Sequence, residues 1–284
     1  MIKAIARKLL DRKPDTHKGD YGRIFVIAGS SSYTGAAYLA GQAALLAGAG
    51  LVTLGVPKSI YPILASKLTE VMVRPFFETR DASLSLMAEK EIVDFALTSD
   101  VVAIGPGLSM NKETQQLARH VIAKVEKPCV VDADGVSSLQ GHLSVLKTAR
   151  HPIVLTPHPG ELARLLTVGT VDVQRDRNAL AIDFSREYNV VLVLKGHGTV
   201  VANPSGESYV NTTGNPGMAT AGAGDVLTGI IAGFIGQGLA PFEAAVLGTY
   251  VHGFAGDLAA KEKGMVSVIA SDLLQKLPEA IKSV

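Results

Sequence analysis

The sequence predicts an α/β fold with a mainly parallel central sheet that is covered by helices on both faces. Two observations support this prediction. Short runs rich in Val, Ile and Leu alternate with longer helical patterns, which is typical of strands buried between two helical layers. In addition, the 284 residues contain no linker, internal repeat or low-complexity segment. A single domain over residues 1–284 is therefore expected.

The expected strands are unbroken apolar runs that follow one another along the chain. The parallel strands are expected at 22–29, 51–56, 101–105, 129–132, 153–156 and 190–195, with a helix rich in small residues at 35–48 between the first two. Residues 199–202 and 208–211 are joined by a turn containing Asn, Pro and Gly, which indicates an antiparallel hairpin toward the C-terminal part. Helical patterns then dominate from Asp225 to the end of the chain.

The composition argues against several classes of protein. A formal net charge of +1 gives no electrostatic basis for binding nucleic acid or an anionic membrane. Cys129 is the only cysteine, so an internal disulfide is impossible and a reducing, cytoplasmic compartment is expected. The N-terminal residues lack the apolar stretch of a signal peptide. The apolar segment 35–54 is rich in Gly and Ala, which indicates a buried helix and strand rather than a membrane span.

Five of the six expected parallel strands end in a loop of small or polar residues. Five such loops lie at 29–36, 105–108, 132–134, 156–161 and 195–199. Taken singly, each loop is more simply an ordinary turn between a strand and a helix. In an open parallel sheet, however, ligands bind beyond the carboxyl ends of the strands. Five small or polar loops at one edge together indicate a binding site.

The most informative segment is the glycine-rich loop at 215–229, which runs into Asp225 and then directly into an apolar helical pattern. Glycines let a ligand approach the backbone, and a helix start presents free N–H donors that suit phosphate oxygens. Because an acid there would repel phosphate, Asp225 is interpreted as a general base for a group that reacts with the phosphate. The alternative is that Asp225 only caps the helix. The loop is not a Walker A motif, since no Gly-Lys-Ser/Thr follows its glycines.

Other loops supply further candidates for binding. Residues 195–199 could meet phosphate or adenosine groups through Lys195 and open amides, although a plain turn between strands is the alternative. His158, held between two prolines, favours contact with a substrate, and Glu161 could either hold a metal-bound water or cap the next helix. The acids of 132–134 could support magnesium or serve the turn. The histidines expected at the surface or in packing are His17, His120, His142, His151 and His252.

Together these motifs resemble the ADP/ATP-dependent NAD(P)H-hydrate dehydratase family, a ribokinase-like group. They occur in family order over nearly the whole chain, as His17-Lys18-Gly19 with Tyr21-Gly22, Gly29-Ser30, Tyr33-Thr34-Gly35-Ala36, Gly105-Pro106-Gly107-Leu108, Asp132-Ala133-Asp134, Thr156-Pro157-His158-Pro159-Gly160-Glu161, Lys195-Gly196, and Gly214-Asn215 through Gly224-Asp225. The family repairs NADH or NADPH that has been hydrated at C6 of the nicotinamide ring, and it consumes a nucleotide phosphate. The resemblance implies a ribokinase-like fold and lyase activity. It covers only the dehydratase part of fused relatives, so no epimerase activity is expected.

The resemblance also implies roles for individual positions. The S-form of the hydrated nucleotide would contact Ala36, Gly107, His158 and Asp225, with Asp225 as the catalytic base. The adenine nucleotide would contact Lys195, Gly196, His197, Gly198, Thr199 and Gly224. The co-substrate would be ADP, which yields AMP and phosphate, or alternatively ATP. Mg²⁺ would assist the loop amides in stabilising the transferring phosphoryl group. Family members are commonly tetrameric, which implies a homo-oligomer whose Gly- and Ala-rich helices at 35–48 and 230–238 permit close packing.

Two other functions are compatible with the sequence. One is a ribokinase-like, ATP-dependent kinase of a small hydroxymethyl vitamin precursor. Relatives that bind magnesium through an Asn-x-x-Glu motif have Asn where this chain has His158, which argues against that kinase and leaves the metal geometry open. The other is a non-catalytic nucleotide sensor on the same fold, in which a base such as Asp225 would have no purpose.

Overall fold

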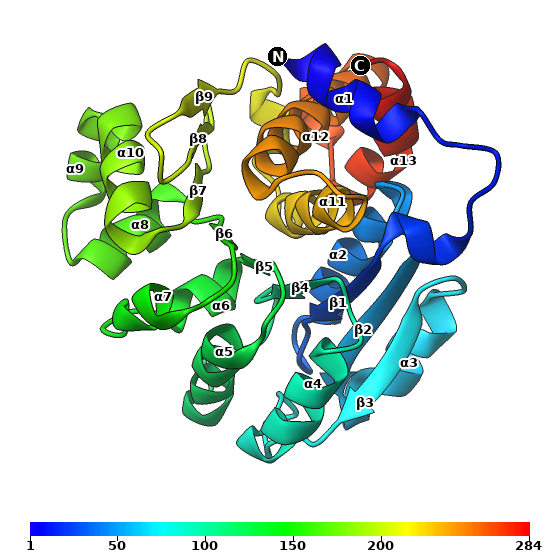
Figure 1. Ribbon diagram of the computed structural model, residues 1–284, viewed down its shortest axis with the longest axis vertical. Helices are drawn as coiled ribbons and strands as arrows, with labels where there is room; N and C mark the ends of the chain where they lie inside the picture. Colours follow the sequence, from blue (N-terminus) through cyan, green and yellow to red (C-terminus); the bar gives the residue numbers. More distant parts are fainter.

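The computed structural model describes residues 1–284 as a sheet between two layers of helices (Figure 1). Its strands are β1 Arg23–Ile27, β2 Leu51–Pro57, β3 Met72–Phe76, β4 Val101–Ile104, β5 Cys129–Val131, β6 Ile153–Leu155, β7 Val191–Leu194, β8 Val200–Ala202 and β9 Ser208–Val210. They form one nine-stranded sheet in the order β3-β2-β1-β4-β5-β6-β7-β8-β9. Strands β1 to β7 are parallel, and β8 and β9 are antiparallel. The predicted mainly parallel sheet with a late antiparallel hairpin is confirmed.

Strand β3 is an element that the sequence analysis missed. Its residues include Arg74 and Pro75, and it lies at one edge of the sheet, half exposed. Proline removes a ladder donor and is tolerated in strands mainly at such edges. The unbroken apolar pattern that identified the central strands is therefore absent here.

Helices cover both faces of the sheet and enclose two separate apolar cores. One face carries α1 Ile2–Leu10, α2 Thr34–Leu46, α3 Tyr61–Lys67, α11 Ala223–Gly236, α12 Pro241–Lys263 and α13 Ala270–Lys282. The other face carries α4 Glu89–Ala96, α5 Lys112–Lys124, α6 Ala133–Ser137, α7 Ser144–Thr148, α8 Pro159–Leu166, α9 Thr170–Arg175 and α10 Arg177–Tyr188. Short 3-10 turns lie at Lys18–Tyr21, Lys58–Ile60, Leu86–Ala88, Pro216–Met218 and Met265–Ser267. None of the helices has the length and apolar character needed to cross a membrane.

Helices α2 and α11 pack against each other at backbone distance. A Cβ added to Gly229 would lie 2.2 Å from the carbonyl oxygen of Ala40, and one added to Gly233 would lie 2.8 Å from that of Ala44. The small residues of both helices thus allow contact within one chain. They explain the composition of these helices without a second subunit, so the predicted homo-oligomer now depends on the family resemblance alone.

The strand order reverses direction between β1 and β4. The chain runs from β1 outward through β2 to β3 and then returns to place β4 on the other side of β1. Crevices at such a switch point, beyond the carboxyl ends of the strands, are the usual ligand sites of open α/β sheets. Two of the predicted substrate residues lie here: Ala36 in the first turn of α2, which follows β1, and Gly107 in the loop after β4.

Candidate active site

A buried polar network closes the carboxyl ends of three neighbouring strands. Asp132, Thr156 and Lys195 directly follow β5, β6 and β7. The Asp132 carboxylate accepts hydrogen bonds from Lys195 Nζ at 2.6 Å and from Thr156 Oγ1 at 2.7 Å. Its second oxygen accepts from Thr228 Oγ1 at 2.7 Å. Because Thr228 belongs to α11, Asp132 joins the start of that helix to the edge of the sheet.

Asp132 and Lys195 form a buried ion pair. Burial alone would raise the pKa of Asp132, but the ammonium of Lys195 and the two hydroxyl donors lower it. Burial alone would lower the pKa of Lys195, but the Asp132 carboxylate raises it. Lys195 lies in the wall of the cavity described below, as predicted for a nucleotide-binding residue, while its ammonium is already bound to Asp132.

Asp225 lies in the first turn of α11, close to this network but outside it. No side chain caps this helix, because the residue at its N-cap is Gly222 with a φ of 91°. The interpretation of Asp225 as a helix cap is therefore wrong. Burial, reinforced by the nearby Asp132 carboxylate, raises the pKa of Asp225 to about 7. A carboxylate with that pKa can accept a proton at neutral pH and release it again.

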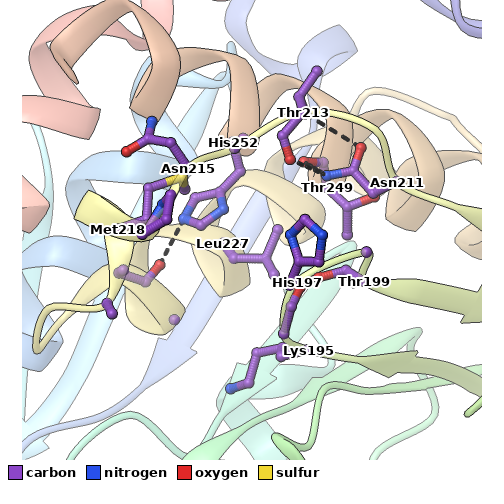
Figure 2. Close-up of a pocket in the computed structure, with 18 of the residues that line it drawn as sticks. Lys195, His197, Thr199, Asn211, Thr213, Asn215, Met218, Leu227, Thr249 and His252 are labelled. Carbon is purple, nitrogen blue, oxygen red and sulfur yellow. Dashed lines mark hydrogen bonds between the residues drawn. The ribbon is translucent and has the colours of Figure 1, made fainter. Parts of the chain in front are cut away.

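A cavity of about 740 Å³ opens beside the start of α11 (Figure 2). It is lined by residues 195–199 after β7, by the loop at 211–220, by the beginning of α11 and by one side of α12. The predicted nucleotide residues that line it are Lys195, Gly196, His197, Gly198, Thr199 and Gly224. The structure therefore brings together every position that was assigned to the nucleotide.

Glycine at position 224 fits this crowded corner. A Cβ there would lie 3.2 Å from Lys195 Nζ and 3.7 Å from Asp132 Oδ2. The backbone at the start of α11 therefore runs directly alongside the ion pair. Free N–H groups at a helix start attract anions, so this corner can receive a phosphate group.

The loop at 211–220 is fixed by side chains that bond to the backbone. Asn211 Nδ2 donates to the carbonyl oxygens of Thr213 and Thr249, each at 3.1 Å. Asp257 accepts from the Gly214 amide and from Asn215 Nδ2, each at 2.9 Å. These bonds tie the loop to α12 and hold the far wall of the cavity in place.

His252 is a cavity residue that the sequence analysis grouped with surface or packing histidines. Its Nε2 donates to the carbonyl oxygen of Ala223 at 2.8 Å, the contact drawn as a dashed line beside the ring in Figure 2. Burial lowers the pKa of His252 to about 4, so the ring is neutral at pH 7. The available signal was weak: polar Thr249 and small Gly253 accompany His252 within the mostly apolar stretch 244–256 of α12.

His158 begins α8 and also faces the cavity. Its Nδ1 accepts from the amides of Gly160 and Glu161, while a Glu161 oxygen accepts from the His158 amide at 2.7 Å. This reciprocal arrangement is a capping box, so the capping alternative for Glu161 is present in the structure. The other ring nitrogen, Nε2, lies 3.5 Å from Oε1 of Glu161. Because His158 lines the same cavity as residues 195–199, the structure does not separate its predicted substrate role from the nucleotide site.

Ala36 and Gly107 lie together at the switch point, outside the cavity wall. Gly107 has a φ of 62°, and a Cβ there would lie 3.0 Å from the Ala36 Cβ and 2.5 Å from that of Tyr33. Ser30 Oγ donates to the Gly107 carbonyl oxygen at 2.8 Å. Two predicted substrate positions, one in α2 and one in the loop after β4, are thus neighbours, and side chains at Gly107 are excluded by the backbone and its surroundings.

The acidic groups of the site suit a magnesium ion that is bound mainly through phosphate. No group of three or more His, Cys, Asp or Glu side chains is arranged to hold a metal ion. Both oxygens of Asp132 are already engaged, whereas Oε1 of Glu161 takes no part in the capping hydrogen bond and has only the His158 ring nitrogen 3.5 Å away. Magnesium commonly takes one or two carboxylates together with phosphate oxygens and water. The residues present fit that mode of binding.

Sequence comparison relates nearly the whole chain to one family. A family profile described as NAD(P)H-hydrate dehydratase matches residues 24–279. The bifunctional NAD(P)H-hydrate repair enzyme Nnr of Moorella thermoacetica is 49% identical over 272 residues, which is 96% of this chain and 51% of that protein. This chain therefore spans about half the length of that relative. The ADP-dependent (S)-NAD(P)H-hydrate dehydratase of Bacillus subtilis is 33% identical over 276 residues, which is 96% of this chain and 94% of that one.

A solved structure agrees with the sequence comparison. The crystal structure of the ADP/ATP-dependent NAD(P)H-hydrate dehydratase from Bacillus subtilis, co-crystallized with ATP and Mg²⁺, superimposes with a TM-score of 0.86 at 30% identity. The match covers 100% of this chain and 97% of that one. A hydroxyethylthiazole kinase from Pyrococcus horikoshii reaches a TM-score of 0.65 at 17% identity, a similarity of fold alone.

Proposed function

Because this chain belongs to the NAD(P)H-hydrate dehydratase family, we propose that it uses ADP to dehydrate the S-form of hydrated NADH or NADPH. The protein is thus a lyase of nicotinamide nucleotide repair. The observation that carries the proposal is Asp225, a half-buried carboxylate with a pKa of about 7 at the start of a helix that borders the cavity. A nucleotide sensor would have no use for a base at this point, because binding alone transfers no proton.

The nucleotide occupies the cavity between residues 195–199 and α12. Its volume of about 740 Å³ is in the range of small-molecule sites. The amides of 221–224 and the start of α11 face the phosphates. The hydrated nicotinamide lies toward Ala36 and Gly107 at the switch point, so that its reacting hydroxyl reaches Asp225 between the two ligands.

The chemistry follows from the poor leaving ability of hydroxide. Asp225 takes the proton of the C6 hydroxyl while that oxygen attacks the terminal phosphoryl group of ADP, which releases AMP. The C6 oxygen then leaves as phosphate, helped by electrons of the ring nitrogen, and loss of a ring proton restores the double bond of NADH or NADPH. Asp132 and Lys195 hold the start of α11 in place during these steps.

Magnesium is proposed as the cofactor of the phosphoryl transfer. Glu161 would hold it through water, together with phosphate oxygens of the nucleotide. Once bound, the ion neutralises charge that develops on the transferring group. ADP is proposed as the co-substrate in preference to ATP, as in the names of two relatives from Bacillus subtilis and Neisseria meningitidis.

A product assay tests the function directly. Purified protein is incubated with NADPH hydrate, Mg²⁺ and either ADP or ATP, and the absorbance of reduced nicotinamide at about 340 nm is followed. We expect recovery of the chromophore with ADP, together with release of AMP and phosphate. A stable phosphate ester of a hydroxymethyl compound, with no recovered chromophore from any hydrate, would instead establish the vitamin-precursor kinase.

A further inference from the structure

Arg177, the first residue of α10, holds the loop at 195–199 from the side opposite the cavity. Its Nη1 donates to the carbonyl oxygen of His197 at 2.8 Å. Its Nη2 donates to those of Leu194 at 2.7 Å and Lys195 at 3.0 Å. One guanidinium thus binds three carbonyl groups within four consecutive residues.

The position of Arg177 is unfavourable apart from these contacts. A cation at the start of a helix opposes the positive end of the helix dipole. The hydrogen bonds of this guanidinium go to backbone carbonyls rather than to a carboxylate, and its Nε is buried without an acceptor. Such a residue stabilises α10 poorly, so its contribution lies in the loop that it binds.

The contacts of Arg177 determine which way the loop amides point. In a trans peptide the C=O and N–H groups point in opposite directions. With the carbonyls of Lys195 and His197 bound to Arg177, the N–H groups of Gly196 and Gly198 point away from it, and neither has a backbone acceptor in the protein. Both glycines line the cavity.

Glycine at position 196 suits both the backbone and this contact. Its φ is 135°, a conformation that favours glycine, and a Cβ there would lie 3.0 Å from Arg177 Nη1. A side chain at position 196 would therefore strain the loop and push the guanidinium from its place. Residues from two separate elements are matched to each other at this point.

We propose that Arg177 is a positioning residue for nucleotide binding, because it orients the free amides of Gly196 and Gly198 toward an anionic or polar group of the nucleotide. The inference rests on the proposed function for the identity of the ligand. Successive amides that converge in this way form an anion-binding concavity. The fixed positive charge behind the loop also favours the phosphate end of a nucleotide.

The test compares two changes at Arg177 with a matched control on the same helix. In Arg177→Gln the charge and two of the donors are lost, whereas Arg177→Lys keeps a charge without the planar fork. Arg186 is the control: it is also an arginine of α10 and packs against Gly206, a positive-φ glycine in the distant β8–β9 turn. For each protein, ADP affinity is measured by calorimetry, and the two KM values and the melting temperature are measured separately.

We expect Arg177→Gln to weaken ADP binding by at least about tenfold, as for loss of charge-assisted hydrogen bonds, with the hydrate KM and melting temperature unchanged. The ADP affinity of Arg177→Lys should lie between those of Arg177→Gln and the unmutated protein. The ADP affinity of Arg186→Gln should equal that of the unmutated protein. If Arg177→Gln does not fold, the lysine variant decides alone. Unchanged ADP affinity in Arg177→Gln would overturn the proposal. So would weaker ADP binding that comes with an equally raised hydrate KM and a lower melting temperature. ADP binding without turnover by the unmutated protein would overturn the proposed function and leave the role of Arg177 open to this same comparison.

Discussion

The end of β5 and the start of α11 each contribute one acid to the same site, and the two acids differ in the partners of their carboxylates. Asp132 is buried and bonded to Lys195 and to two hydroxyl groups. Asp225 is half-buried beside it without such partners. Burial disfavours the charge of both, but only Asp132 is compensated, so its pKa falls while that of Asp225 rises to about 7. The difference assigns a structural task to the first and proton transfer to the second.

The largest expected effect is on turnover at the start of α11. Asp225→Asn preserves the shape of the side chain and removes its basicity, so kcat should fall by about a hundredfold to ten-thousandfold, with ADP binding largely kept. Steady-state kinetics and calorimetry on the same preparation check both quantities. Near-normal turnover in this variant would show that Asp225 is not the base.

The same change at Asp132 should act mainly on stability. Asp132→Asn leaves the Lys195 ammonium buried without its counter-ion, and breaking a buried pair from one side costs about 3–5 kcal/mol of the free energy of unfolding. Urea denaturation at pH 7 measures the loss. A variant as stable as the unmutated protein would show that the ion pair adds nothing to the stability of the fold.

Asp225→Asn should raise the stability of the protein, whereas Asp132→Asn should lower it. The folded protein holds the Asp225 proton more tightly than the unfolded chain, because the pKa rises from 3.8 to about 7 on folding. Stability from this group is therefore complete below pH 3.8 and is lost as the pH rises toward 7. Asp225→Asn, which cannot ionise, should be more stable than the unmutated protein at pH 8 by about 2–4 kcal/mol. The advantage should disappear toward pH 4, which urea denaturation at the two pH values can establish.

The pH dependence of turnover sharpens the comparison further. Since Asp225 must be deprotonated to accept a proton, kcat/KM should fall as the pH drops through about 7. Removing the Asp132 charge takes away one cause of the raised pKa, so Asp132→Asn should shift this acid limb to lower pH. An unmoved limb would mean that the Asp132 charge does not contribute to the raised pKa of Asp225.

His158 offers a smaller effect with a built-in control. His158→Asn keeps a residue that caps helices well and removes the ring nitrogen Nε2. If His158 contacts the hydrated nicotinamide, hydrate binding should weaken by about 1–3 kcal/mol while ADP affinity stays nearly unchanged. Separate calorimetric titrations distinguish the two ligands. Loss of ADP affinity with hydrate binding intact would assign His158 to the nucleotide, in keeping with its place in the cavity wall.

The oligomeric state is the property expected to affect the candidate site least. We propose a homo-oligomer, specifically a homotetramer, from the family resemblance. Light scattering at micromolar concentration should give a multiple of the 29.7 kDa chain mass. The mass of one chain under those conditions would reject it.

Sequence patterns predicted where the candidate site lies, but they did not identify all of the residues that form it. The strand ends and the glycine-rich loop were recognisable because parallel strands and helix starts impose strict local requirements on residue type. Asp132 was left between two interpretations, since its partners Thr156, Lys195 and Thr228 come from three distant segments. Arg177 and His252 gave almost no local signal. Their roles arise from contacts with backbone carbonyls, which any sequence provides and no residue pattern marks.

The backbone contact between α2 and α11 has a consequence for motion during the reaction cycle. Glycines at 229 and 233 leave no side chain between the two helices that could change rotamer and let one slide past the other. Asp225 on α11 and Ala36 on α2 therefore travel as parts of one rigid body.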